Sequence, residues 1–349
     1  MSPDELRILP KVLLHDHLDG GLRPHTILEL AEIDGYDGLP SRDLDELTDW
    51  FFQGQSASLE RYLEAFAHTV GVMQTAEGIE RVSYEATEDL AAQGVVYAEM
   101  RMAPSLCTER DLDRTEAIGA ILAGMSRGEA EFGVPVRLIV DAMRQDSDSI
   151  EVARAAVEFA GEGVVGFDLA GPEAGYSAVD HRAACEIAIE GGLHLTIHAG
   201  EGDGVQSIVG AIEVGAERLG HAVRLVEDIR VVAGEAEKLG PVAQSILDAG
   251  LTLEVCPTSN LHTGLFPDAR SHPLGLLHRA GFAVTINTDN RLMSRISPTD
   301  EFSFAVEHQG FDVQDLELVT MRAIDAAFCD RATKDRVAAT VMAGYLEAD

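Results

Sequence analysis

The chain has 349 residues, 46% of them hydrophobic, which is enough to bury a large core in two ordinary domains or in one large barrel. Its 26 basic and 60 acidic residues give a formal net charge of −34, and such a field repels phosphate backbones and anionic lipid. The charge therefore argues against nucleic-acid and membrane partners and favours a neutral or cationic small molecule.

Cysteine spacing and apolar segments bear on the cellular compartment. The four cysteines lie far apart and form no CxxC pair, so neither a disulfide framework nor a thiolate zinc site is expected. The chain opens without a basic segment leading into an apolar one, and no apolar run approaches the length that spans a bilayer. We therefore expect a soluble cytoplasmic protein, and the sequence leaves open whether it is a monomer or a homo-oligomer.

Short apolar runs bounded by Gly, Pro, Asp or Asn are predicted to be β-strands. In chain order they are residues 12–17, 95–102, 136–143, 164–171, 193–200, 217–223, 251–259 and 282–289. Several are rich in Val, Ile and Leu, which is typical of strands covered on both faces.

Segments with helical periodicity separate these strands. Residues 76–94 carry an apolar stripe that ends before Gly94, and residues 146–163 offer Ser147 or Ser149 as an N-cap. Strand and helix alternate through eight predicted strands, which favours a closed parallel barrel over an open sheet. We predict an α/β fold in which residues 1–349 form a single (β/α)8 TIM barrel domain.

Two regions interrupt the alternation. Residues 22–93 separate the first two strands by more than one crossover helix requires, so we expect a helical insertion that covers the barrel mouth. The chain after about residue 296 has a helical pattern, and we expect extra C-terminal helices packed outside the barrel.

Two histidines end the first predicted strand, in the stretch VLLHDHLDG at residues 12–20. Side chains alternate between the two faces of a strand, so His15 and His17 point the same way. The strand ends at LDG, which places both imidazoles near the carboxyl ends of the strands, where barrel enzymes build their sites.

Other polar side chains end three further strands: His198 in IHAGE, His221 in LGHA and Asp289 in TINTDN. A barrel brings these strand ends together. A single histidine at a strand end is more often a core or loop residue, but three imidazoles and a carboxylate together form a typical zinc shell. Zinc with one open position lowers the pKa of bound water from 15.7 to about 7.

Glu201 follows His198 by three residues in HAGE and enters the loop after the strand. It can stand beside the metal shell without joining it, which suits a carboxyl that transfers protons. His221 could be a further ligand or could orient the water. We favour orientation, because the shell is already complete with His15, His17, His198 and Asp289.

The motifs HDHLDG, DLAGPE, HAGE, GHA and NTDN, in this order, resemble those of the adenosine deaminase family within the amidohydrolase barrels. The resemblance extends through nearly the whole chain. It implies one Zn²⁺ per chain, held by His15, His17, His198 and Asp289. It also implies that Glu201 carries a proton to purine N1 and that His221 positions the attacking hydroxide.

The resemblance further implies contacts to a purine nucleoside. Gly171 would offer its backbone NH to purine N3, and Asp19 would receive the ribose 5′-hydroxyl. The stretch SLERYLEAF at residues 58–66 is similar to the family's hydrophobic gate. Its apolar positions at helical spacing are Leu59, Tyr62, Leu63 and Phe66. Each of these residues equally suits simple core packing of an amphipathic helix.

Asn290 departs from the family pattern, in which a second acid follows the position of Asp289. That acid must be protonated to donate to purine N7, whereas an Asn amide donates at every pH. We therefore expect Asn290 to keep the N7 contact.

The function expected from the resemblance is hydrolytic deamination of adenosine and 2′-deoxyadenosine to inosine and 2′-deoxyinosine plus ammonia. Free adenine, an aminofutalosine-type nucleoside and methylated AMP are neighbouring substrates, and the carboxylate of Asp19 would repel the phosphate of the last. A binuclear amidohydrolase and a non-catalytic nucleoside-binding barrel are the remaining alternatives. The sequence FDLAG at the end of the fourth predicted strand lacks a bridging lysine, and intact Glu201 and Asp289 disfavour the binding protein.

Overall fold

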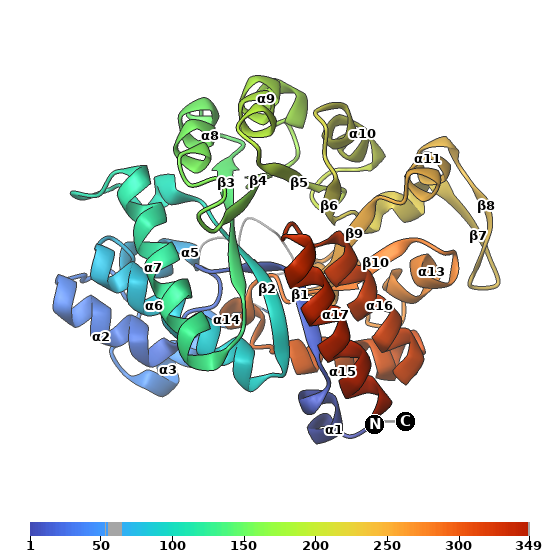
Figure 1. Ribbon diagram of the computed structural model, residues 1–349, viewed down its shortest axis with the longest axis horizontal. Helices are drawn as coiled ribbons and strands as arrows, with labels where there is room; N and C mark the ends of the chain where they lie inside the picture. The colour runs from blue at the N-terminus through green and yellow to red at the C-terminus, as the bar shows by residue number, and fades with distance from the viewer. Residues whose placement is uncertain (53, 55–64, 348–349) are drawn as a thin grey trace.

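The structure is a computed structural model that describes residues 1–52, 54 and 65–347. Eight parallel strands form one sheet in the order β1-β2-β3-β4-β5-β6-β9-β10 (Figure 1). Their bounds are β1 Lys11–His17, β2 Val95–Met102, β3 Val136–Met143, β4 Val164–Ala170, β5 His194–Ala199, β6 Arg218–His221, β9 Thr252–Val255 and β10 Ala283–Ile286. A parallel bridge between Asp16 and Asp289 joins the end of the sheet to β1, and the sheet closes into a barrel. The predicted barrel is therefore confirmed.

The seventh and eighth predicted strands are shorter than expected. Residues 251–259 were predicted as one strand, but β9 ends at Val255 and α12 (Pro257–His262) begins two residues later. Pro257 lacks the amide hydrogen that a sheet ladder needs, and its fixed φ suits the first turn of a helix. An antiparallel hairpin of β7 (Ile229–Val232) and β8 (Glu235–Leu239) was not predicted and projects from the barrel (Figure 1).

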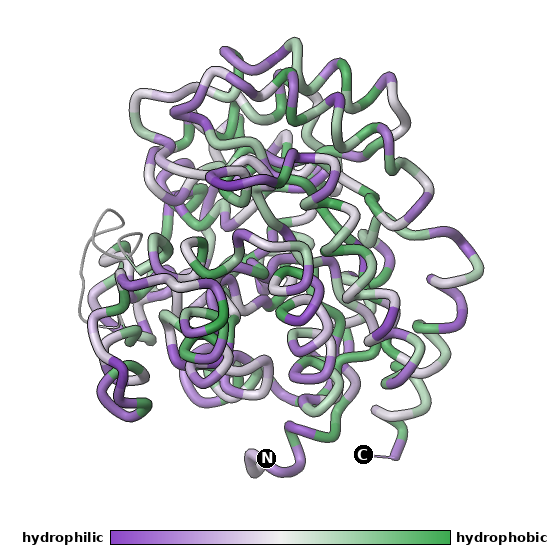
Figure 2. Tube along the Cα trace, turned by 90° about the vertical axis from the view of Figure 1, so that its left-hand side faces the viewer, coloured by the Kyte–Doolittle hydropathy of each residue, from purple (hydrophilic) through white to green (hydrophobic). Residues whose placement is uncertain are grey.

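Helices cover the outside of the barrel between the strands (Figure 1). Those that follow β2 through β9 include α7 Arg114–Phe132, α8 Ser149–Val157, α9 Arg182–Glu190, α10 Val205–Glu213, α11 Pro241–Ala249 and α13 Leu274–Arg279. Short 3₁₀ turns lie at Pro104–Cys107, Ala178–His181 and Val223–Asp228. Hydrophobic and hydrophilic stretches alternate along the helical trace (Figure 2), as expected for helices with one buried face. No helix in the described ranges is long and apolar enough to cross a membrane.

The predicted N-cap of α8 was wrong. The cap residue is Asp148, rather than Ser147 or Ser149, and its side chain makes no capping hydrogen bond. Its carboxylate instead accepts hydrogen bonds from Ser105 and Arg114, each at 2.7 Å. The tertiary contact with the segment after β2 therefore replaces the local cap.

The insertion after β1 is helical, as predicted. It contains α2 Pro24–Asp34, α3 Leu44–Phe51, α5 Phe66–Gly71 and α6 Ala76–Ala92. The helix predicted before Gly94 is thus confirmed as α6, and Gly94 itself has a φ of 73° that favours glycine. Phe66, Ala67 and Val70 of α5 line a cavity at the barrel mouth.

Both ends of the chain pack beside the barrel. The C-terminal helices are α14 Arg291–Ser294, α15 Pro298–Gln309, α16 Val313–Ala326 and α17 Arg331–Leu346, and the N-terminal helix is α1 Pro3–Ile8. Helix α16 contacts β1 and β10, while α17 contacts α16 and β2. The predicted packing of the C-terminal helices outside the barrel is confirmed.

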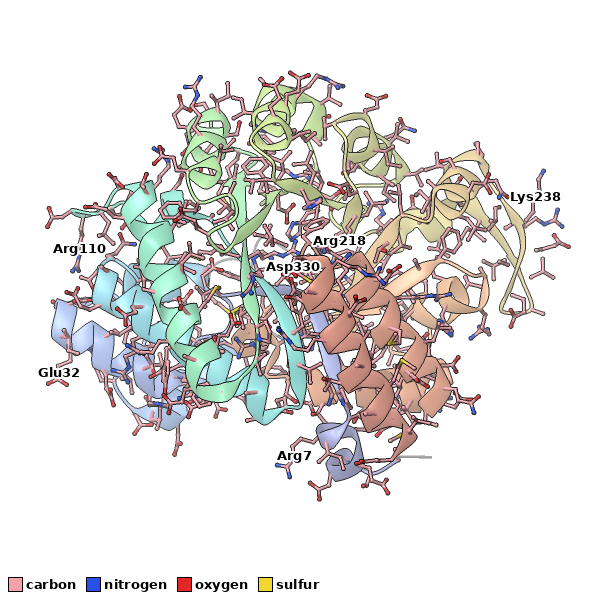
Figure 3. The ribbon with its side chains drawn as sticks, viewed as in Figure 1. Arg7, Glu32, Arg110, Arg218, Lys238 and Asp330 are labelled. Atoms are coloured by element: carbon pink, nitrogen blue, oxygen red, sulfur yellow. The ribbon has the colours of Figure 1, made fainter. Side chains whose placement is uncertain are left out.

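The interior of the barrel contains charged side chains as well as the apolar side chains of the core. Arg101 and Arg218 are almost completely buried, and both contact the buried carboxylate of Glu254. Figure 3 shows Arg218 at the middle of the molecule, whereas Arg7 and Lys238 lie at its outside. The polar interior leads to the carboxyl ends of the strands, where the candidate site lies.

Candidate active site

A compact group of donors lies at the carboxyl ends of β1 and β5 and just beyond β10. Donor atoms of His15, His17, His198 and Asp289 all lie within 4.8 Å of one another. His17 Nε2 lies 3.2 Å from His198 Nε2 and 3.4 Å from Asp289 Oδ1, and His15 Nε2 also lies 3.4 Å from that oxygen. Four donors around an ion at about 2.0–2.1 Å in a tetrahedron are separated by about 3.3 Å. The group therefore matches the spacing of a tetrahedral metal shell.

The orientation of two of these imidazoles is set by carboxylates on their far side. His15 Nδ1 lies 3.0 Å from Glu254, and His198 Nδ1 lies 2.8 Å from Asp168. Arg101 donates to both carboxylates. A carboxylate on Nδ1 holds the proton there and leaves Nε2 free as a metal ligand. His15 Nε2 is buried and has no hydrogen-bond partner among the described residues, as expected for a nitrogen that serves as a metal ligand.

His17 has a similar but looser arrangement. Its Nδ1 lies 3.6 Å from Asp141 and 4.0 Å from Asp19. Burial, together with the neighbouring Asp168, raises the pKa of Asp141 well above its usual range. Burial also raises the pKa of Asp19, to about 7.

Asp289 and His221 hold strained backbone conformations. Their φ angles are 59° and 58°, a region that costs a residue other than glycine about 1–3 kcal/mol. Ser259 donates a hydrogen bond of 2.5 Å to Asp289 Oδ2, which leaves Oδ1 facing the histidines. Burial opposes ionisation of Asp289, but the surrounding imidazoles of His15, His221 and His17 hold its pKa well below the usual value.

Glu201 and His221 form a second pair next to this group of donors. Glu201 Oε2 lies 3.5 Å from His221 Nε2, and the amide of Asn260 contacts both side chains. Burial, reinforced by Asp289 and Glu173, raises the pKa of Glu201 well above its ordinary value. A carboxyl that keeps its proton in this environment can donate it to a substrate.

His221 belongs to a second, overlapping set of possible metal ligands. A second donor set, which consists of His15, His221, Cys256 and Asp289, also lies within 4.8 Å. It shares two residues with the first set, so the two sets describe alternative ion positions. Burial raises the pKa of the Cys256 thiol well above its usual value. The first set consists of three imidazoles and a carboxylate, which is a typical zinc shell, and it does not include His221.

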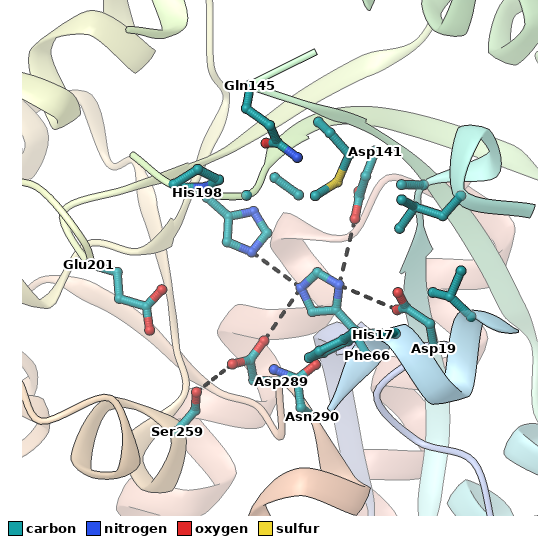
Figure 4. Close-up of a pocket in the computed structure, with 18 of the residues that line it drawn as sticks. His17, Asp19, Phe66, Asp141, Gln145, His198, Glu201, Ser259, Asp289 and Asn290 are labelled. Atoms are coloured by element: carbon teal, nitrogen blue, oxygen red, sulfur yellow. Dashed lines mark hydrogen bonds and ion pairs between the residues drawn. The ribbon is translucent and has the colours of Figure 1, made fainter. Parts of the chain in front are cut away.

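A cavity of about 390 Å³ opens above these groups. The carboxylates of Glu201 and Asp289 and the imidazoles of His17 and His198 converge on it (Figure 4). Apolar walls come from Phe66, Val70, Ala103, Leu106 and Met143. The acids that line it are Asp19, Glu109, Asp141, Glu201 and Asp289. No lysine or arginine is among its described lining residues.

The structure brings together most residues that the sequence predicted for the substrate. Asp19, Gly171, Asn290 and Phe66 all line the cavity. Asn290 Oδ1 is buried and lacks a hydrogen-bond partner among the described residues. The predicted gate residues Leu59, Tyr62 and Leu63 lie outside the described residues.

Several functional side chains were missed by the sequence reasoning, above all Asp168, Glu254 and Asn260. The first two interrupt apolar strands, in FDLAG and LEVCP. A charge inside a strand that is covered on both faces must find a partner, and that signal could have identified them. An eight-stranded parallel barrel with histidines and an aspartate at the carboxyl edge is typical of the amidohydrolase class.

Comparisons with known proteins agree with this class. A family model described as adenosine deaminase matches residues 10–343. An adenosine deaminase of Mycobacterium ulcerans is 51% identical over 332 residues, which are 93% of this chain and 92% of the relative. Adenosine deaminase 1 of Streptomyces coelicolor is 48% identical and covers 94% of this chain and 84% of its own length. The crystal structure of an adenine deaminase from Arthrobacter aurescens has a TM-score of 0.87 at 26% identity, over 96% of this chain and 98% of that chain. The chain belongs to the adenosine deaminase family and is a hydrolytic deaminase.

Proposed function

We propose that this enzyme hydrolyses adenosine and 2′-deoxyadenosine to inosine and 2′-deoxyinosine with release of ammonia. The observation that carries the proposal is the pairing of Glu201 with the group of metal-binding donors in a cavity of nucleoside size. Relatives that are 51% and 48% identical in sequence to this chain are named adenosine deaminase and adenosine deaminase 1, which supports the same substrate.

The metal that we propose is a single Zn²⁺ per chain. Three imidazole nitrogens and one carboxylate oxygen, with nothing softer among them, suit zinc in a tetrahedral shell. The overlap of the two donor sets at His15 and Asp289 argues against two ions at once. When bound, the ion supplies Lewis acidity that makes water nucleophilic near neutral pH.

Glu201 would transfer the protons, and His221 would orient the attacking water. As water adds to C6 of the purine, Glu201 gives its proton to N1 and regains one from the attacking water. The Asn260 amide donates to His221 Nδ1, so His221 Nε2 carries the ring proton, donates a hydrogen bond to that water and fixes its direction. The C6–N6 bond then breaks as Glu201 gives the regained proton to the amino group, which leaves as ammonia. The new C6 hydroxyl returns its proton to Glu201, and the 6-oxopurine remains.

Four cavity residues would hold the nucleoside. Asp19 would accept the ribose 5′-hydroxyl, and the backbone NH of Gly171 would donate to purine N3. The Asn290 side-chain amide would donate to N7, and Phe66 would cover the base. Asp19 and Asp141 both line the cavity, and no described lining residue is a lysine or arginine, so the carboxylates would repel a 5′-phosphate that has no basic side chain to pair with. The proposed substrate is therefore a nucleoside rather than a nucleotide.

The test is turnover by the purified, zinc-replete protein, followed by the absorbance change of deamination. We expect adenosine and 2′-deoxyadenosine to react, AMP to be inert, and 7-deazaadenosine to react poorly because it lacks N7. Glu201→Gln should lower kcat by at least about 100-fold with unchanged zinc content. Glu190→Gln, at an exposed position of α9, is the control and should match the parent. Faster turnover of adenine than of adenosine would overturn the substrate assignment.

A further inference from the structure

A carboxylate outside the cavity holds the loop that carries Glu201. Glu173 follows β4 in the stretch DLAGPE and is only 4% exposed. Its Oε1 accepts the backbone NH of Glu201 at 2.8 Å and that of Gly202 at 2.9 Å, and its Oε2 accepts the NH of Gly200 at 2.8 Å. One side chain therefore satisfies three consecutive amides of the loop after β5.

These amides depend on Glu173 because of the shape of the loop. Gly200 has a φ of 78°, and a Cβ there would lie 2.7 Å from the side chain of Ile208. The turn takes the three NH groups out of the β5 ladder, and none of them donates to a backbone carbonyl in the described structure. Without Glu173, the amides of the buried residues Gly200 and Glu201 would lack an acceptor, which is costly, and the amide of the more exposed Gly202 would lose its partner.

Arg144 holds the other end of the same segment. It lies directly after β3, is 2% exposed, and donates to the backbone carbonyl of His198. It also donates to the carbonyls of Leu169 at 3.3 Å and Tyr176 at 3.2 Å, which flank the loop of Glu173. Residues 198–202 are thus fixed from both sides by the loops that follow β3 and β4.

We propose that Glu173 is a positioning residue for the reaction, which sets the place of the Glu201 carboxyl in the cavity by fixing its backbone. Glu173 does not line the cavity, so it acts through Glu201 rather than on the substrate. The proposal rests on the proposed function, because it takes Glu201 as the group that moves the proton.

The test compares Glu173→Gln with the parent. A Gln amide must turn its NH₂ toward at least one of the loop amides, so two donors face each other there. We expect kcat for adenosine to fall up to about 100-fold, as misplacement of a catalytic group by about 1 Å can cause. KM and zinc content should stay near parental values. Hydrogen exchange of the Gly200, Glu201 and Gly202 amides should become faster.

Asp228→Asn is the matched control, because Asp228 also accepts two backbone amides, of Val242 and Ala243, each at 2.8 Å, but lies away from the cavity. It should lose stability without losing kcat. Equal loss of kcat in both variants, or full kcat in Glu173→Gln, would overturn the proposal. So would unchanged exchange of the loop amides.

Two provisions keep the result decisive. Should Glu173→Gln fail to fold, Glu173→Asp keeps the charge on a shorter side chain, and its loss of kcat should run parallel to its faster amide exchange. A parent protein that is inactive on adenosine would refute the proposed function. The role of Glu173 in the reaction would then fall with the proposed function, while faster amide exchange in Glu173→Gln would still support its hold on the Glu201 backbone and unchanged exchange would refute that hold too.

Discussion

Glu254 accepts hydrogen bonds from four side chains inside the barrel, which is the largest set for one carboxylate near the site. One oxygen receives His15 Nδ1 at 3.0 Å and Arg101 at 2.7 Å, and the other receives Thr196 at 2.8 Å and Arg218 at 2.7 Å. Such a carboxylate remains ionised and keeps the proton of His15 on Nδ1.

Replacement of Glu254 by Gln should weaken metal binding. The amide cannot accept from all four donors, and His15 loses the charge that orients it, so we expect about 10–100-fold lower affinity for Zn²⁺. Competition with a chromophoric chelator measures this. Thr196→Val removes a neutral donor from the same carboxylate without touching His15, and it should change the affinity far less. Equal losses in the two variants would contradict the orienting role.

At the residue scale, the sequence predicted the groups that face the cavity but not those behind them. His15 and His198 stand at strand ends in recognisable motifs. Asp168 and Glu254 look like isolated acids in apolar strands, and their partners lie 30 or more positions away in the chain, as in the pairs Asp168–His198 and Glu254–His15. Strand register, which sequence does not display, decides these pairs.

At the scale of elements, α15 and α12 are joined through a buried carboxyl. Glu301 of α15 is 1% exposed and accepts the backbone NH of Thr258, near the start of α12, at 3.2 Å. Burial is the main cause that raises its pKa from 4.5 to about 8, and the charges of Asp300 and Asp289 act in the same direction.

This pKa predicts a pH dependence of stability. Between pH 4.5 and about 8 the folded protein holds a proton on Glu301 that the unfolded chain has released, so stability falls as pH rises through this window. The slope from this group is at most about 1.4 kcal/mol per pH unit. Glu301→Gln should remove this contribution to the slope. The free energy of unfolding of the variant, relative to that of the parent, should therefore be higher at pH 8 than at pH 5.

Urea unfolding at several pH values measures that difference. Glu307→Gln changes an exposed carboxyl on the same helix and should keep the parental profile. Parallel profiles for Glu301→Gln and the parent would show that burial does not hold the proton on Glu301.

The elements themselves were largely predictable. Short apolar strands and amphipathic helices follow from local periodicity, and β2 and β3 coincide with the predicted ranges. The β7–β8 hairpin was missed because its residues are mostly exposed, so no buried face marks its strands. The end of β9 was missed although Pro257 follows it, a residue that cannot donate to a sheet ladder and that suits the first turn of a helix.

At the scale of the whole molecule, an ion at the barrel edge would join β1, β5 and the segment after β10. An ion that binds only the folded state stabilises it by about 4 kcal/mol when present at 1,000 times its Kd. We therefore expect a chelator to lower the melting temperature of the zinc-replete protein by several degrees.

Differential scanning calorimetry with and without added zinc tests this expectation. His17→Ala should largely abolish the zinc-dependent shift. His194→Ala should retain it, because His194 is exposed at the opposite end of β5 and pairs with Glu217. If neither chelator nor added zinc changed the melting temperature of the parent protein, a metal that stabilises the barrel edge would be ruled out.

The sequence by itself determined the barrel, the helical insertion after the first strand and the strand-end residues that meet at the cavity, because periodicity and motifs are local properties of the chain. Only the tertiary structure decided that Glu254 and Asp168 orient the histidines and that Glu173 holds the loop of Glu201. Those contacts join neighbouring strands and loops whose register depends on closure of the whole barrel, and no local pattern in the chain encodes that register.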